Sequence, residues 1–155
     1  MIVRWPRFSF YGVLVLALVA DQLTKAWATR SLQPVRYVEL IPGFFDLTYV
    51  RNPGIAFGMF AHQGWLVAIF MIVLVAVAFY FMRGMSWAGW EPNVVGGALC
   101  GGAVGNLVDR WRYGYVVDFF DAHVAALHLY WPVFNVADSL ICMAVGWIVI
   151  RQLKS

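Results

Sequence analysis

Long apolar runs alternate with short polar connections along the chain, and they predict four membrane-spanning helices. The runs cover residues 8–28, 65–82, 94–108 and 131–150. Stretches of about 17 to 25 apolar residues can cross hydrocarbon as helices, because each residue adds about 1.5 Å. The run over 65–82 carries no charge, whereas the run over 94–108 is short and rich in glycine. We therefore expect an all-α membrane fold with four spans.

A different pattern fills residues 31–64, between the first two runs. Residues 35–40 and 44–50 are rich in β-branched and aromatic side chains, which favour strands. Pro42 and Gly43 lie between them and suit the two central positions of a type II turn. We expect an extramembrane antiparallel sheet over 31–64, resting on the membrane surface.

Composition supports a membrane protein and excludes other classes. The 155 residues are 63% hydrophobic and only 12% charged, and the mean hydropathy is +0.74, so residues 1–155 are predicted to form one integral membrane domain. Lysine and arginine are scattered singly despite a net charge of +3, which argues against binding nucleic acid. Cys100 and Cys142 lie in apolar segments without metal-ligand spacing, as buried small residues do.

An even number of spans places both termini on one side of the membrane. Basic residues are divided equally between the two sides, so charge alone leaves the orientation undecided. Arg4 and Arg7 precede the first span, and on that basis we place the termini in the cytoplasm. The same two residues, the apolar run and Ala26-Trp27-Ala28 also resemble a cleavable signal peptide.

Small residues recur at every fourth position of the third run. Gly97, Gly101 and Gly105 follow the spacing that lets a neighbouring helix approach closely. This pattern indicates packing and carries no chemistry.

Polar residues of different runs are predicted to lie at one depth. Asp21 and Asp138 are each seven residues from the outer end of their runs, which places both about 10 Å below the same surface. Asn106, Asp109 and Arg110 lie at the same end of the third run. We expect a polar pocket just below one membrane surface, roofed by the sheet.

Local spacing suggests partners for some of these charges. Asp21 and Lys25 are four residues apart and can pair on one helix face, and Asp109 can pair with Arg110 or Arg112. Buried charges need such partners merely to be stable, which is the simplest explanation for these pairs.

Asp118 and Asp138 have no basic residue three or four positions away. Two carboxyls brought together out of water share a proton, leaving one as a base and one as an acid. An ionisable residue inside an apolar span is itself a candidate for function. Asn135 lies one turn before Asp138 and can hold its carboxyl by a hydrogen bond. His123 and His128 could line the pocket or bind a metal with Asp118. No cysteine or second acid at the usual spacing completes a ligand set, so we expect surface or interfacial histidines and no metal.

Five sequence blocks, in this order, resemble the lipoprotein signal peptidase (signal peptidase II) family of intramembrane aspartic endopeptidases. The blocks are Asp21-Gln22-Leu23-Thr24-Lys25, Asn52-Pro53-Gly54-Ile55-Ala56-Phe57-Gly58, Gly101-Gly102-Ala103-Val104-Gly105-Asn106-Leu107-Val108-Asp109-Arg110, Val117-Asp118-Phe119 and Phe134-Asn135-Val136-Ala137-Asp138.

The resemblance implies that Asp118 and Asp138 are the catalytic pair. It also implies a four-helix protein of the cell (inner) membrane that cleaves prolipoproteins just before a diacylglyceryl-modified cysteine, without a cofactor. Its partners would be these substrates and membrane lipid, with the chain acting as a monomer and the site near the outer face. The positions that it assigns to shaping or binding the substrate are Asp21, Lys25, Asn52, Gly54, Asn106, Asp109, Arg110 and Asn135.

Two other functions remain open from the residues alone. Intramembrane acids also build relays in proton- or ion-coupled carriers, which need polar groups along a path to both faces. A structural assembly factor could instead use the glycine-rich run to bind a partner helix.

Overall fold

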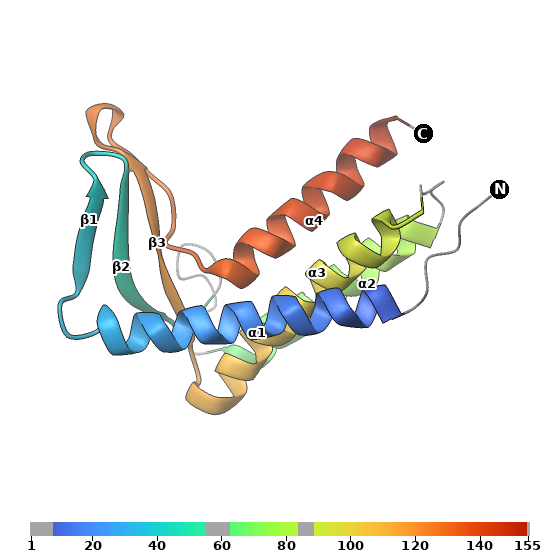
Figure 1. Ribbon diagram of the computed structural model, residues 1–155, viewed down its shortest axis with the longest axis horizontal. Helices are drawn as coiled ribbons and strands as arrows, with labels where there is room; N and C mark the ends of the chain where they lie inside the picture. Colours follow the sequence, from blue (N-terminus) through green and yellow to red (C-terminus); the bar gives the residue numbers. More distant parts are fainter. Residues whose placement is uncertain (1–7, 55–62, 84–88, 155) are drawn as a thin grey trace.

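Four long helices and a small antiparallel sheet make up the part of the chain that the structure describes (Figure 1). The computed structural model describes residues 8–54, 63–83 and 89–154, and residues 55–58 of the second sequence block lie outside them. In chain order the elements are α1 (Phe8–Ser31), β1 (Tyr37–Ile41), β2 (Phe45–Asn52), α2 (Gly64–Arg83), α3 (Glu91–Tyr113), β3 (Val116–Val124), a short 3₁₀ helix (Ala125–Leu127), β4 (Leu129–Tyr130) and α4 (Val136–Leu153).

Three of the described helices are long and apolar enough to cross a membrane. They correspond to α1, α2 and α4, over Ser9–Ser31, Trp65–Met82 and Val136–Leu153. The prediction of four spans is therefore supported for three only. The run over 94–108 lies in α3, whose hydropathy is low because glycine replaces bulky apolar residues and one end carries Asn106, Asp109 and Arg110.

The glycines of α3 make direct helix contacts. A Cβ at Gly101 would lie 2.6 Å from Ala17 Cβ on α1, and one at Gly102 would lie 2.7 Å from the Ala137 carbonyl oxygen on α4. The packing prediction is confirmed, and α1 is the neighbour that approaches. Because α3 is enclosed by other helices, it needs fewer side chains suited to lipid.

Apolar side chains of α2, α3 and α4 fill the bundle away from the sheet. The core includes Met71, Leu99, Ile141, Ala144 and Ile148. Burial of such side chains is the main favourable term that holds the helices together where they are shielded from lipid by one another.

The sheet contains more strands than the sequence predicted. The order is β1-β2-β3-β4, so the β1–β2 hairpin pairs with β3 from the connection after α3. The predicted turn is present: Phe44 N donates to the Ile41 carbonyl at 2.9 Å, and Gly43 has a φ of 75°, as a type II turn requires. In the β2–β3 register Val50 pairs with Asp118, which brings the end of β2 beside that acid.

The fourth helix begins later than predicted. Residues 131–135 are not helical, and α4 starts at Val136. Asp138 is thus in the first helical turn. The predicted depth of Asp138, which counted seven helical residues from Trp131, is therefore wrong. The convergence survives, because Asp21 Oδ1 accepts a hydrogen bond from Ala137 N at 3.1 Å.

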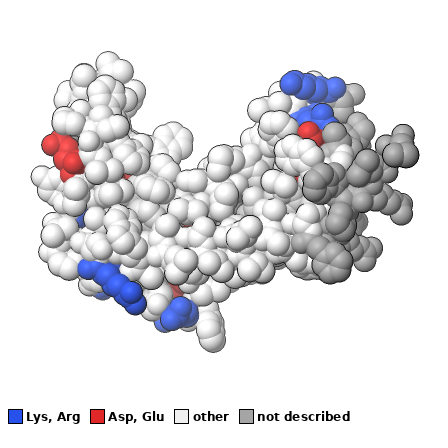
Figure 2. Space-filling model, in the orientation of Figure 1, with Lys and Arg blue, Asp and Glu red and all other residues white. Residues whose placement is uncertain are grey.

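The sheet lies at one end of the molecule, while α1 begins and α4 ends at the other (Figure 1). Figure 2 shows charged side chains at both ends of this face and a largely uncharged surface between them. This distribution fits a protein whose middle contacts hydrocarbon.

Candidate active site

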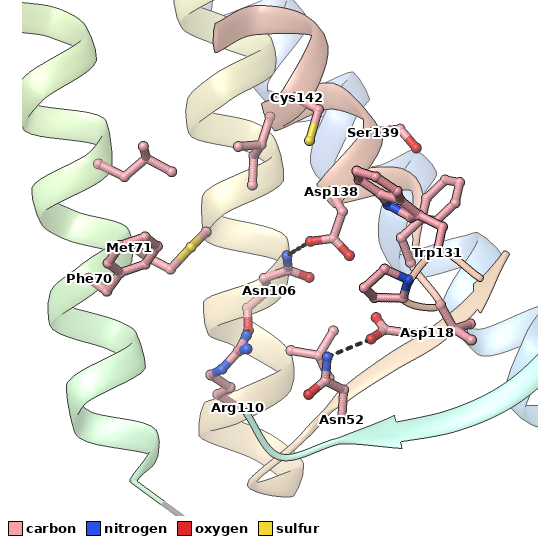
Figure 3. A pocket seen from close by; sticks show the side chains of 16 residues that line it. Asn52, Phe70, Met71, Asn106, Arg110, Asp118, Trp131, Asp138, Ser139 and Cys142 are labelled. Carbon is pink, nitrogen blue, oxygen red and sulfur yellow. Dashed lines mark hydrogen bonds between the residues drawn. The ribbon is translucent and has the colours of Figure 1, made fainter. Parts of the chain in front are cut away.

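A cavity of about 550 Å³ lies between the sheet and the helices. Phe70, Met71 and Leu74 of α2 and Ile141 of α4 contribute apolar lining. Figure 3 shows the polar side chains on the other side of the cavity, facing those of α2. The polar residues that line it are Asn52, Asn106, Arg110, Asp118, Asp138 and Ser139.

Asp118 lies on β3 and is only 1% exposed. Its carboxylate oxygens accept hydrogen bonds from Asn52 Nδ2 at 2.8 Å and from Asn135 Nδ2 at 2.7 Å. Burial, followed by the nearby charge of Asp138, raises the pKa of Asp118 to about 7. A carboxyl with such a pKa can keep its proton near neutral pH, as a general acid must.

Asp138 reaches the same cavity from the start of α4. Its carboxylate accepts from Asn106 Nδ2 at 2.7 Å and from the backbone N–H of Asn135 at 3.2 Å. Asn135 caps the helix in return, because its Oδ1 accepts from Asp138 N at 2.9 Å. The predicted contact between Asn135 and Asp138 is present through the backbone N–H, whereas the side-chain amide of Asn135 donates to Asp118.

Arg110 supplies the positive charge at the cavity. Its Nη2 donates to the Gly54 carbonyl at 2.5 Å and its Nη1 to the Asn106 carbonyl at 3.2 Å. The Nε atom is buried and has no hydrogen-bond partner among the described residues. The pairing predicted between Asp109 and an arginine is wrong, since Asp109 pairs with Lys25 instead.

Lys25 lies at the centre of a buried charge cluster behind the cavity. Its Nζ contacts Asp21 Oδ2 at 2.8 Å and Asp109 Oδ2 at 3.0 Å, and it donates to Asn106 Oδ1 at 2.8 Å. The predicted Asp21–Lys25 pair is confirmed. These contacts join α1 to α3, so the segment that resembles a signal peptide is part of the folded site.

The residues predicted for the site therefore divide into two layers. Asn135 and Gly54 contact the lining through hydrogen bonds, while Asp21, Lys25 and Asp109 lie behind it and do not line the cavity. Sequence reasoning gave Gln22 no role of its own, although its Nε2 donates to Asp109 Oδ1 at 3.0 Å. The apolar wall from α2 was also missed, because the sequence does not distinguish apolar side chains that line a cavity from apolar side chains that face lipid.

His123 and His128 lie outside this cavity. His123 Nδ1 is 3.7 Å from Asp121 Oδ1, and His128 is exposed. Ligand atoms of Asp46, Asp121 and His123 lie within 4.8 Å of one another across β2 and β3. Asp46 was not considered from the sequence because only the β2–β3 register brings it opposite Asp121.

Known proteins resemble this chain in both sequence and fold. Residues 13–154 match the family described as Signal peptidase (SPase) II. The chain is 42% identical to a lipoprotein signal peptidase of Syntrophotalea carbinolica, covering 90% of this chain and 88% of the relative. It is 39% identical to a lipoprotein signal peptidase of Shewanella piezotolerans, covering 98% and 87%.

Two solved structures have the same overall fold. Both are described as bacterial membrane enzymes determined by the in meso method, at 2.3 Å and 1.9 Å resolution. Each is 29% identical to this chain, with TM-scores of 0.83 and 0.80. The alignments cover 99% of this chain and 93% of the first structure, and 100% of this chain and 99% of the second. The family match over nearly the full length, together with these relatives, shows that this chain belongs to the signal peptidase II family of peptidases.

Proposed function

We propose that the protein removes signal peptides from prolipoproteins, using Asp118 and Asp138 as an aspartic dyad. The observation that carries this proposal is that both carboxyls face one cavity, each held by two hydrogen bonds. Cleavage takes place just before a cysteine that carries a diacylglyceryl group.

The two-sided character of the cavity supports such a substrate. Acids and amides on one side can bind a peptide bond, while Phe70, Met71 and Leu74 on the other offer an apolar surface. In a substrate with a lipid attached beside the scissile bond, the peptide bond can meet the polar side of the cavity while the lipid meets the apolar side. Burial of acyl carbons against this wall contributes to binding.

The reaction is a hydrolysis in which water adds to the scissile carbonyl. The ionised member of the dyad takes one proton from the water as its oxygen bonds to carbon, and the protonated member donates a hydrogen bond to the developing oxyanion. The C–N bond then breaks, and a carboxyl proton passes to the leaving nitrogen. The products are a new carboxyl on the signal peptide and a free amine on the cysteine.

Arg110 is placed to bind the substrate backbone. Its Nη1 and Nη2 donate to protein carbonyls, which orients the guanidinium at the edge of the cavity. Each of these terminal nitrogens carries a second N–H, which can donate to a substrate carbonyl. Asn52 fixes Asp118 from the end of β2.

The proposed setting is the cell (inner) membrane, with the chain acting as a monomer. The termini lie in the cytoplasm, α3 crosses the bilayer enclosed by the other helices, and the sheet lies at the outer surface. The cavity then opens where a lipid-modified cysteine meets the headgroup region, and membrane lipid surrounds the helices.

The two alternative functions fit the structure less well. A carrier needs polar groups through the bundle, but the described core between the cavity and the far end of the helices is apolar. An assembly factor needs a free glycine face on α3, but Gly101 and Gly102 already contact α1 and α4.

The decisive experiment replaces each acid separately with its amide. Asp118→Asn and Asp138→Asn should each lower cleavage of a lipidated precursor peptide by at least about a thousandfold, because the dyad then lacks its base or its acid. Folded protein is checked by gel filtration and circular dichroism in detergent.

Asp121→Asn is the matched control, since Asp121 is on the same strand but does not line the cavity. Cleavage by this variant should match that of the unaltered protein. Substantial cleavage by either dyad variant would show that the two acids are not the catalytic pair.

A further inference from the structure

Three asparagine side chains surround the acid pair, and the orientation of each amide is set by a neighbour that can only donate. Asn52 Oδ1 accepts from Gly54 N at 3.0 Å, and Asn135 Oδ1 accepts from Asp138 N at 2.9 Å. Each amide must then direct its NH₂ group the other way, towards Asp118. Backbone N–H groups thus determine both contacts to Asp118.

The contact to Asp138 is determined differently. Asn106 Oδ1 accepts from Lys25 Nζ at 2.8 Å, and Asn106 Nδ2 donates to Asp138 Oδ1 at 2.7 Å. A lysine ammonium has three donors and no acceptor, so it dictates the direction of this amide. Lys25 is 3% exposed, and its other contacts are to Asp21 and Asp109.

We propose that Lys25 is a positioning residue that acts through the Asn106 amide to keep Asp138 as the ionised member of the pair, leaving the shared proton on Asp118. This inference rests on the proposed function. A cation polarises the amide between it and the carboxylate, which strengthens the hydrogen bond to the charged form. Asp138 also lies in the first turn of α4, where the helix dipole favours a negative charge.

Other charges and titratable groups around Asp138 do not distinguish the two acids in the same way. Each element packed against the start of α4 contributes such groups. They are Asp21 and Lys25 of α1, Asp109 and Arg110 of α3, Asp118 of β3 and Cys142 of α4 itself. Arg110 interacts with both members of the dyad. The charge of Lys25 also acts on Asp118, but the hydrogen-bonded connections differ. Asn106 donates directly to Asp138, whereas Asn135 Nδ2, which donates to Asp118, competes with Lys25 for the same Asn106 oxygen at 3.2 Å. Among the described residues, the amide that Lys25 polarises therefore donates to Asp138 and not to Asp118.

Two relay variants test the route while keeping the charge of the cluster constant. Asp21, Lys25 and Asp109 together carry one net negative charge when ionised. Lys25→Gln with Asp109→Asn removes the first link, the contact from Lys25 to Asn106, and retains that net charge. Asn106→Leu keeps Lys25 and the net charge, but it removes the second link, the NH₂ donor to Asp138.

The measurement is kcat/KM for a lipidated precursor peptide as a function of pH. The acid limb should move to higher pH by about one unit in both relay variants, because the base needs a higher pH to ionise without the relay. Asp109→Asn alone retains both links and removes one negative charge, so its acid limb should stay in place or move to lower pH. For Lys25→Gln with Asp109→Asn, KM should change by less than about threefold, since neither residue lines the cavity.

An unchanged acid limb in either relay variant would overturn the proposal, and the loss of cleavage in Asp118→Asn and Asp138→Asn would still uphold the dyad. Cleavage that persists in those two single variants would instead remove the proposed function on which the relay rests. Failure of both relay variants to give folded protein would count against the relay and assign Lys25 a structural role, while one folded relay variant is enough for the test.

Discussion

Burial gives Asp118 properties that its neighbours in sequence do not explain. Its side chain is enclosed between β2 and the start of α4, where two asparagine amides donate to it. Water would stabilise a carboxylate better than this enclosure does, and the charge of Asp138 adds repulsion. The residue therefore retains its proton at a pH where an exposed aspartate is ionised, and this has a measurable effect on stability.

We expect Asp118 to make the folded protein less stable as the pH rises. Its pKa is raised in the folded state from its ordinary 3.8 to about 7. The folded state therefore binds the proton more tightly than the unfolded state, so the stabilisation is complete below about pH 4 and is lost as the pH rises through about 7. Chemical unfolding in detergent measures this loss, which should be at most a few kcal/mol between about pH 5 and pH 8.

Asp118→Asn isolates the effect. An amide at this position meets two NH₂ donors, which contributes a loss of stability of about 1–3 kcal/mol that does not depend on pH. The deficit relative to the unaltered protein should therefore be largest at about pH 5 and should narrow or reverse at about pH 8. A deficit that is constant with pH would show that Asp118 does not carry the shifted proton.

Contacts between secondary-structure elements decide where each acid lies. Helix α3 is the element on which the others are assembled, because its glycines let α1 and α4 approach and its last turns carry Asn106, Asp109 and Arg110. Gly105 leaves space for the Asp21 carboxylate, which a Cβ would overlap. The sheet adds the second acid by pairing β3 with β2.

Gly101→Ala should destabilise the protein by about 1–3 kcal/mol, as overpacking does. The added Cβ would lie 2.6 Å from the Leu14 carbonyl oxygen as well as 2.6 Å from Ala17 Cβ, so α1 must move. The thermal midpoint in detergent measures the loss.

Gly146→Ala is the control, because a Cβ at this position in α4 meets nothing within 4 Å. Its thermal midpoint should be unchanged or slightly higher, since alanine favours helix over glycine. Equal losses in the two variants would mean that the α1–α3 contact is not as close as described.

The arrangement of the complete bundle has consequences for its orientation. Helix α1 begins and α4 ends away from the sheet, and uncharged surface separates the two ends on the face in Figure 2. A bilayer around that surface would put the sheet on one side of the membrane and the end of α4 on the other.

Thiol labelling in intact cells tests this topology. In a protein with Cys100→Ala and Cys142→Ala, an impermeant reagent outside the cell should label Ala126→Cys, which lies in the exposed 3₁₀ helix after β3. Lys154→Cys, at the end of α4, should be labelled only after permeabilisation. Labelling of both from the same side would contradict the proposed arrangement.

Local properties of the chain were sufficient to predict its class and many of its parts. Apolar runs predict helices because hydrocarbon requires internally bonded backbone, and this holds for α1, α2 and α4. The turn at Pro42 and Gly43, the helix contact of Gly101 and the Asp21–Lys25 pair depend on residues close in sequence or on a simple spacing. The ordered polar motifs also predicted the family.

Other features depend on contacts between distant residues, and only the tertiary structure decided them. The addition of β3 to the hairpin, the pairing of Asp109 with Lys25 and the donation from Asn135 to Asp118 all involve partners that no local spacing specifies. The start of α4 at Val136 did have a local signal, the capping pair of Asn135 and Asp138, but the prediction followed the apolar run over 131–134 instead. The amino-acid sequence determined which groups must leave water, whereas the packing of helices and strands determined which partner each buried group meets.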